Sequence, residues 1–518
     1  MPTDDVQWDP PAAGMWFLTT EHFPRPVSRL FSTLFPSTTL GWDGAARRYG
    51  LPAHQGRWAA VNSWLYYAPQ AGDWFDGNEA VAAETLRTQS WRSDIDQWFE
   101  SDRRRVIGLN RVLQAEDPTA LDDVLLADHL RRAIDHYLSV GRLHFELHTA
   151  FSIGGGLAAA ELAAWGIGHD GWLPLMRGAS PASSAARAHI DQIVGALDQA
   201  EPRSVDDIRA AGPAAVAALD AYLDDYGWRC LDQHELRGNT LIERPDILLT
   251  SVRARMTHPD SSTSAVETAS TRADVPEGDH PRFDEVISGL RRAYGCNDDN
   301  VGITWSWPLG LIRRSVLELG RRLVERGAID DADVLFEADR NELTALLDGT
   351  ARPDLGSELA TRNAAYLDAP QLNPPTVLDQ PVDTPERPEP SASVARLVSA
   401  QQALWALATP STEPLTGIGI GDVAYRGRAC VIDGDGYLDL EPGDVIVATV
   451  THAGHNTVFP IAGAVTTACG NLLSHPAVLA RELGLSAVLS VNGLLERVHT
   501  GDLIEVDPVA GVVRVLID

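Results

Sequence analysis

The chain has 518 residues, a formal net charge of −30, 44% hydrophobic residues and 22% charged residues. This length predicts three or four domains with cores of their own, and the composition is that of an ordinary globular protein. The negative charge argues against a broad nucleic-acid-binding surface, which needs clustered Lys and Arg. The sequence shows neither an apolar run of membrane-spanning length nor the apolar core of a signal peptide. We therefore expect a protein of the reducing cytoplasm that binds no membrane.

Aromatic side chains are frequent in residues 1–75, where prolines at 24, 26 and 36 argue against one long helix. Residues 61–67 predict a strand, because their aromatic residues favour extended structure. Trp16 and His22 are candidates for binding a small molecule, since aromatic and polar side chains together line many ligand pockets. Membership of the core is the plain alternative for such residues.

Long helices are predicted for residues 78–115, 122–151 and 182–199, which are rich in Ala, Leu, Arg and Asp. The glycines at 154–156 lack the Gly-Lys-Ser/Thr ending of a phosphate-binding loop, and we expect them to break or kink the helix. Residues 257–279 are rich in Ser, Thr and Asp and are expected to form a mobile loop. Two more helices are predicted at 281–294 and 308–326.

His144 and His148 are four positions apart and so share one helix face, with Glu146 between them. A histidine there is a candidate general base or hydrogen-bond partner for a bound acceptor. A zinc site would need a third ligand, which the sequence does not present, so no metal is expected and two ordinary histidines are the alternative. Arg229 is a candidate for fixing a carboxylate or phosphoryl group, or for pairing with a structural Glu.

Prolines are concentrated in residues 369–394, which predict an extended, semi-rigid linker. We therefore predict a mainly helical region over residues 1–368 and a C-terminal domain over residues 395–518. A short helix is expected at 392–407. The four cysteines, Cys230, Cys296, Cys430 and Cys469, form no CxxC pair, so neither a disulfide framework nor a cysteine zinc site is predicted.

His475 lies where a turn is predicted to open into a short helix. Pro476 suits the first helical turn, and Gly484 suits the left-handed position at the helix end. The helix N-terminus offers unpaired N–H groups and a partial positive charge, which would stabilise a phosphoryl group on the imidazole. Arg481 adds a permanent cation with bidentate reach.

Three segments of the C-terminal domain, at 443–448, 470–484 and 501–511, resemble the phosphohistidine swivelling domain of the phosphoenolpyruvate-utilising enzyme superfamily. The segments at 21–26 and 226–229 resemble the substrate region of rifampicin phosphotransferase and phenylphosphate synthase relatives. The resemblance implies an α+β chain with a large, mainly helical substrate-binding region and a C-terminal β/β/α swivelling domain. It also implies that residues 417–432 form the first hairpin of that domain.

By this resemblance His475 is phosphorylated, Ser474 and Arg481 support it, and Gly470 and Asn471 form the turn beside the phosphate. Two positions depart from the family pattern. Asn471 stands where the family usually has a second glycine, and Ala468 where it often has an acid. Because Asn is the residue that best tolerates positive φ after glycine, we expect the turn to survive.

The sequence shows neither an ATP-grasp domain nor the roughly 250 residues of alternating strands and helices that a phosphoenolpyruvate-binding barrel needs. We therefore expect a phosphotransferase component. A separate ATP-grasp subunit would phosphorylate His475 with ATP and Mg²⁺, and this chain would pass the group to a small organic acceptor. The alternatives are a dehydratase or ligase that uses the phosphorylation to drive a biosynthetic step, and a non-catalytic binding subunit with a degenerate swivelling domain.

Overall fold

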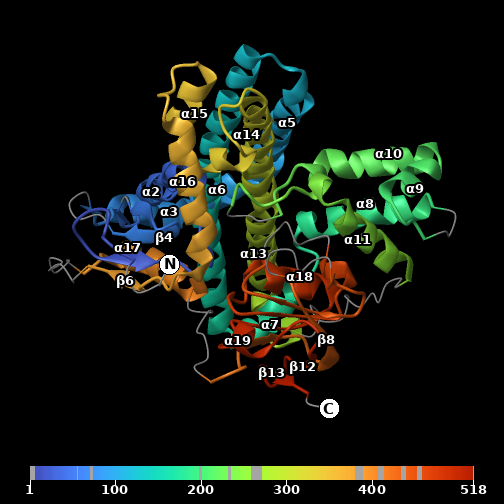
Figure 1. Ribbon diagram of the computed structural model, residues 1–518. Helices are drawn as coiled ribbons and strands as arrows, with labels where there is room; N and C mark the ends of the chain where they lie inside the picture. Colours follow the sequence, from blue (N-terminus) through green and yellow to red (C-terminus); the bar gives the residue numbers. More distant parts are fainter. Residues whose placement is uncertain are drawn as a thin grey trace. The chain divides into compact units, whose positions relative to one another are not determined.

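A computed structural model gives the fold of the chain (Figure 1). It describes residues 6–20, 22–54, 56–69, 74–197, 201–231, 235–257, 271–379, 389–405, 413–432, 439–451 and 458–516. Contacts divide the chain into two compact units, each built from segments that are distant in sequence. Unit 1 consists of Met1–Thr149, Asp232–Asn239 and Ile303–Val398, and unit 2 of Ala150–Leu231, Thr240–Gly302 and Ser399–Asp518. The predicted domain boundaries at residues 368 and 395 stay a prediction.

Unit 1 contains an antiparallel sheet with the strand order β3-β4-β1-β6. Its strands are β1 (Trp16–Leu18), β3 (Arg57–Val61), β4 (Trp64–Ala68) and β6 (Val377–Leu378). The predicted strand at 61–67 is partly wrong, because Asn62 and Ser63 form a hairpin turn between β3 and β4. Both have positive φ, 49° and 67°, as a two-residue turn between twisted strands requires. β6 lies inside the predicted linker, whose residues 380–388 are outside the described ranges.

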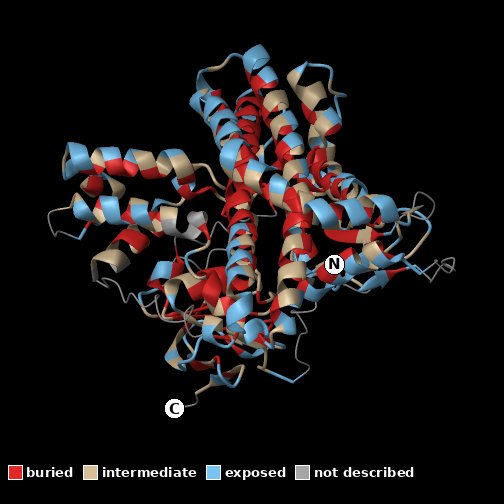
Figure 2. Ribbon diagram, turned by 180° about the vertical axis from the view of Figure 1, so that it is seen from behind, coloured by how far each residue is buried: buried red, intermediate tan, exposed pale blue. Residues whose placement is uncertain are grey.

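Helices make up most of unit 1. Most of them have one buried and one exposed side (Figure 2), whereas α14 (Trp307–Glu325) is buried on nearly all sides over its first half. The predicted helix over 78–115 is three helices, because Gln89 takes a left-handed conformation between the first two and a π-helical turn separates the last two. The helices are α1 (Arg29–Thr38), α2 (Leu40–Tyr49), α3 (Glu79–Thr88), α4 (Ser90–Gln97), α5 (Arg103–Ala115), α14 (Trp307–Glu325), α15 (Arg340–Leu347), α16 (Leu355–Asp368) and the first part of α6 (Asp123–Ala164).

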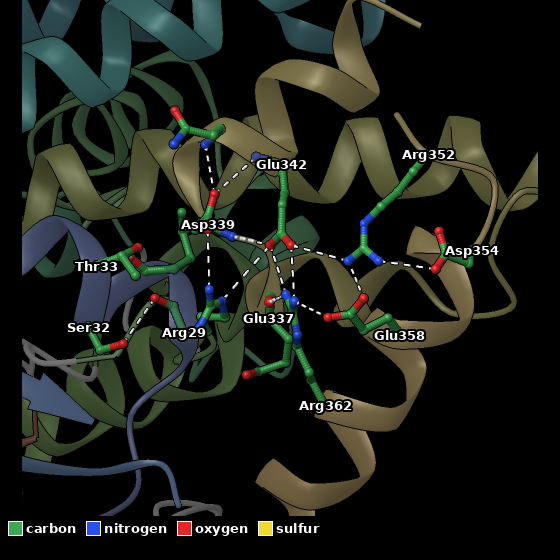
Figure 3. A network of polar contacts seen from close by, with 12 residues as sticks. Arg29, Ser32, Thr33, Glu337, Asp339, Glu342, Arg352, Asp354, Glu358 and Arg362 are labelled. Atoms are coloured by element: carbon green, nitrogen blue, oxygen red, sulfur yellow. Dashed lines mark hydrogen bonds and ion pairs between the residues drawn. The ribbon is translucent and has the colours of Figure 1, made fainter. Parts of the chain in front are cut away.

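A network of ion pairs joins α1, α15 and α16 in unit 1 (Figure 3). Arg362 on α16 donates two parallel hydrogen bonds to Glu342 on α15, at 2.8 and 3.0 Å. Glu342 also closes the N-terminus of α15 in a capping box with Asp339, which accepts from Arg29 of α1 at 3.3 Å. Such fork-like pairs fix geometry as well as charge, so the network sets the register of these helices.

Unit 2 contains the C-terminal part of α6, and the expected break at the glycines 154–156 is wrong. The helix continues through them to Ala164. A β-carbon on Gly156 would lie 1.8 Å from the carbonyl oxygen of Ala400, on α17 (Ala392–Trp405). The glycines therefore allow two helices to approach closely, and this packing outweighs their low helix propensity.

Unit 2 also contains a mixed sheet of seven strands. Its strand order is β13-β12-β8-β9-β10-β11-β7, and the four central strands β8 to β11 are parallel. The strands are β7 (Ile418–Ile420), β8 (Tyr425–Val431), β9 (Val445–Ala448), β10 (Ala464–Thr467), β11 (Ser486–Leu489), β12 (Leu503–Asp507) and β13 (Val512–Val515). The expected hairpin at 417–432 is wrong, because β7 pairs with β11 and β8 pairs with β9 and β12.

Most helices of unit 2 share one hydrophobic core with this sheet, whereas Leu494 belongs to a second cluster with Val445, Val488 and Ile504. Phe283 and Leu290 of α13 belong to the same cluster as Val478 and Leu479 of α18. The helices are α7 (His169–Trp172), α8 (Pro181–Gly195), α9 (Val205–Ala210), α10 (Pro213–Tyr222), α11 (Pro245–Thr257), α13 (His280–Val301), α18 (His475–Leu483) and α19 (Leu494–Arg497). The predicted α+β class is confirmed. Of the expected mobile loop 257–279, residues 258–270 lie outside the described ranges.

None of the described helices is, by itself, both long and apolar enough to cross a membrane. One bent pair, α6 with His169–Met176, meets the requirement only when the two are taken together.

Candidate functional site

His475 is the first residue of α18, which follows the parallel strand β10 through a tight loop. Ser474 precedes the helix in an extended conformation, Pro476 lies in its first turn, and Gly484 ends it with φ 68°. These are the start and the end that the sequence predicts. Because parallel strands of an α/β-type sheet direct their carboxyl ends toward one edge, this loop presents His475 at the edge where ligands usually bind.

The turn before His475 is held by its own side chains. Gly470 has φ 141°, and Asn471 has no positive φ, so the conformation that needs a glycine lies one residue earlier than expected. The hydroxyl of Ser474 donates to the carbonyl oxygen of Asn471 at 2.6 Å, and the side-chain oxygen of Asn471 accepts from the N–H of Leu473 at 2.8 Å. Asn471 therefore replaces the second glycine of the family pattern with a side-chain turn.

The imidazole of His475 contacts a buried carboxylate on another element. Its Nδ1 lies 3.2 Å from Oδ1 of Asp298, near the end of α13, and the two side chains are 12% and 5% exposed. The other oxygen of Asp298 accepts a short hydrogen bond from the hydroxyl of Ser180. A carboxylate only accepts, so in the neutral form of the ring Nδ1 carries the proton and Nε2 the lone pair. Nε2 is buried and has no hydrogen-bond partner among the described residues.

Arg481 lies on the same helix and meets α13 one turn away from Asp298. It is 7% exposed, and its Nη1 donates to the hydroxyl oxygen of Tyr294 at 3.3 Å. Its Nη2 is buried without a partner among the described residues. Burial raises the pKa of Tyr294 to about 12, although Arg481 opposes the shift. Tyr294 is therefore a neutral hydroxyl, and the guanidinium keeps unused donors for an anion.

Glu482 fixes α18 to the segment before α8. Its carboxylate oxygens accept from the N–H of Gly178 at 2.9 and 2.8 Å, and Arg177 donates to the carbonyl oxygen of Arg481 at 2.9 Å. Burial raises the pKa of Glu482, and the backbone N–H groups of Gly178 and Ser180 offset part of that shift. The helix that carries His475 is thus held by polar contacts along its length.

The predicted acceptor residues lie in different parts of the chain. In unit 1 the rings of His144 and His148 stack at 6.4 Å, and the ring of His144 lies 5.3 Å from that of Trp305. Glu146, between them in the sequence, forms an ion pair with Arg48, with 3.4 Å between Oε2 of Glu146 and Nη1 of Arg48. A shared face for the two histidines is confirmed, whereas their role as a base stays a prediction.

Trp16 and His22 are also in unit 1. Trp16 is 2% exposed and packs with Trp64 and Tyr66 in a cluster on the four-stranded sheet, whereas His22 is exposed. Arg229 belongs to unit 2, where its guanidinium lies 4.2 Å from the ring centre of Tyr226 and its Nε donates to the carbonyl oxygen of Asp225 at 2.8 Å. No three His, Cys, Asp or Glu side chains within the described residues are placed to hold a metal ion.

Sequence reasoning missed Asp298, Ser180 and Tyr294. Asp298 is 177 positions from His475, and no motif surrounds it. Its one visible signal is an acidic pair, Asp298-Asp299, which lies between Asn297 and Asn300 in the sequence. Burial of such a pair indicates a partner, but the sequence does not say which one.

Two family models match segments of the chain. Residues 440–511 match the mobile domain of PEP-utilising enzymes, and residues 182–304 match the fourth domain of rifampicin phosphotransferase. Residues 440–511 are thus similar to the mobile domain of the PEP-utilising enzymes. The resemblance predicted from the sequence is thereby confirmed, and His475 and Asp298 lie in the two matched segments.

Individual relatives align with part of the chain. An uncharacterised protein of Mycobacterium tuberculosis strain H37Rv is 32% identical over 206 residues, which are 40% of this chain and 22% of the relative. A rifampicin phosphotransferase of a Streptomyces species is 27% identical over 59% of this chain and 35% of its own length. The uncharacterised phosphotransferase YvkC of Bacillus subtilis is 24% identical over 57% and 36%. The alignments thus span about a third or less of these curated relatives.

Proposed function

We propose that this chain is the acceptor-side component of a phosphotransferase and that His475 carries the phosphoryl group. The observation that carries the proposal is the state of the imidazole. Its Nδ1 is occupied by Asp298, and its Nε2 has no partner at the N-terminus of a helix. A neutral imidazole with a lone pair on Nε2 is a nucleophile for phosphorus. The match of residues 440–511 to the mobile domain supports the same role.

The chemistry divides into two transfers. In the first, Nε2 of His475 forms a bond to phosphorus while the bond from phosphorus to its donor oxygen breaks. In the second, an acceptor hydroxyl forms a bond to phosphorus while the Nε2–P bond breaks, and the electron pair returns to Nε2. The N–H groups of α18 and the unpaired Nη2 of Arg481 supply positive charge on this helix.

A separate ATP-grasp subunit is the proposed source of the phosphoryl group, with ATP and Mg²⁺ bound there. Between Glu79 and Asp368 the described residues form helices and no paired strands longer than an isolated bridge. A barrel for phosphoenolpyruvate, built from alternating strands and helices, is therefore not among the described residues. Similarity to rifampicin phosphotransferases supports a small organic acceptor.

We propose that the C-terminal domain moves during turnover, because Nε2 is buried in this arrangement. A donor phosphate reaches this nitrogen only when the residues that cover it move away. The segment at 369–394 is the proposed tether for this motion.

Intact-mass spectrometry under alkaline conditions, which preserve phosphohistidine, tests the proposal. The protein is incubated with ATP, Mg²⁺ and a candidate ATP-grasp protein encoded next to it. We expect a mass gain of one phosphoryl group, which is absent from His475→Ala and retained by His499→Ala, a matched change at a histidine whose side chain is 72% exposed. A gain that persists in His475→Ala, or no gain with any ATP-grasp partner tried, would contradict the proposal.

A further inference from the structure

We propose that Asp298 is the positioning residue of the phosphoryl-release step, because it keeps the proton on Nδ1 of His475 while the group on Nε2 departs. This inference rests on the proposed function. It assigns a role in phosphoryl release to Asp298 and locates the release step at α13, in the helical part of unit 2.

The charge of Asp298 is directed at the imidazole of His475. The carboxylate is 5% exposed, and Ser180 and His475 are its hydrogen-bond partners. No arginine or lysine pairs with it among the described residues. A buried carboxylate without a permanent cation is costly, and a ring N–H is the group that offsets this cost here. Ser180 fixes the carboxylate through its second oxygen, so Oδ1 stays directed at Nδ1.

The Nδ1 proton decides how well the imidazole of His475 serves as a leaving group. When the Nε2–P bond breaks, its electron pair stays on Nε2. If Nδ1 carries a proton, the product is a neutral imidazole. If Nδ1 is deprotonated, the product is an imidazolate anion, which is a far poorer leaving group in a buried site. The acceptor hydroxyl forms the new O–P bond and gives its proton to a base of the acceptor site or to solvent. By holding the Nδ1 proton, Asp298 favours departure of the ring as a neutral imidazole.

Nε2 of His475 is buried and has no partner among the described residues, while Nδ1 remains bonded to Asp298. That arrangement is the one expected directly after departure, with a neutral ring and the lone pair restored. The contact joins a residue of the segment matched to the rifampicin phosphotransferase fourth domain with a residue of the mobile-domain segment. Docking of the mobile domain therefore brings His475 to the group that assists release.

The test separates loading from release. Wild-type protein and variants are phosphorylated with potassium phosphoramidate, so that loading needs neither a partner nor Asp298. Loss of phosphate from the peptide that contains His475 is then followed at neutral pH by mass spectrometry, with water as the acceptor. We expect Asp298→Asn to slow this loss at least tenfold and Asp298→Glu to restore part of the rate. Asp299→Asn, the same change at the neighbouring residue, which is 2% exposed, should have no such effect.

A spectroscopic measurement distinguishes proton holding from a merely structural role. In ¹⁵N NMR spectra of the unphosphorylated protein, His475 should show a protonated Nδ1 and an unprotonated Nε2. In Asp298→Asn this preference should be lost while the rest of the spectrum stays that of a folded protein. Equal release rates in wild type and Asp298→Asn, equal slowing by Asp299→Asn, or an unchanged tautomer would overturn the inference. A protein that is not phosphorylated on His475 by ATP and a partner would instead contradict the proposed function.

Discussion

Replacing Gly156 with alanine is expected to destabilise unit 2, although alanine is the better helix former. The substitution gains about 1 kcal/mol of helix propensity. The new β-carbon would lie 1.8 Å from the carbonyl oxygen of Ala400, where an ordinary contact begins at 3.4 Å. α6 and α17 must therefore separate by more than an ångström, and overpacking of this kind costs about 1–3 kcal/mol, or more where backbone is displaced. Because the contact is with the backbone, we expect a cost at the upper end of this range, which leaves a net loss of about 2 kcal/mol in the free energy of unfolding.

Gly108→Ala is the matched control for this prediction. Gly108 lies inside α5 with no atom within 4 Å of a β-carbon, so alanine there should stabilise the protein by about 0.5–1 kcal/mol. Urea unfolding gives the two free energies, and amide hydrogen exchange shows where the protein opens. Exchange should accelerate in α17 for Gly156→Ala alone. If Gly156→Ala stabilises the protein as Gly108→Ala does, the close packing of α6 against α17 is refuted.

Three further predictions concern both units. Burial, together with the charge of Arg105, lowers the pKa of His136 to about 4. Between pH 6.5 and pH 4 the unfolded chain therefore binds one proton more than the folded chain, and the free energy of unfolding falls by up to about 3 kcal/mol as the pH falls. Urea titrations at pH 7 and pH 5 should show this loss in wild type and a smaller one in His136→Gln. Gly470→Ala forces a side chain into φ 141° and within 3.1 Å of the Ser474 hydroxyl, so it should cost about 1–3 kcal/mol in thermal unfolding and slow phosphorylation of His475. Arg362→Met removes the fork-like pair of Figure 3 and should lower the free energy of unfolding by about 1–3 kcal/mol, less at high salt, whereas an unchanged midpoint of urea unfolding would show that the network contributes nothing.

Local sequence signals predicted the phosphohistidine helix well. Pro476 and Gly484 mark its start and its end because each acts through its own backbone dihedral angles. This effect is local and does not depend on residues far away in the sequence. The position of Asp298 beside His475 could not be predicted in the same way. That contact arises when α13 and α18 pack into one core, and a single sequence carries no record of such a pairing across 177 positions.

Two incorrect predictions have the same origin. The low helix propensity of the glycines near 156 predicted a break in the helix. In the structure the helix continues, and Gly156 allows close packing against the backbone of Ala400. The family resemblance implied a hairpin over residues 417–432, yet β7 pairs with β11, and β8 pairs with β9 and β12. In each case contacts between separate segments determine the structure, and a single sequence does not show these contacts.

The central claim is that His475 carries a phosphoryl group on Nε2. The most direct measurement is ³¹P NMR of the phosphorylated protein at alkaline pH, combined with fragmentation of the peptide that contains residues 470–484. The account predicts one phosphorus signal typical of Nε2-phosphohistidine, with the phosphate on His475. A phosphate on Nδ1 of His475, or on any other residue, would contradict it.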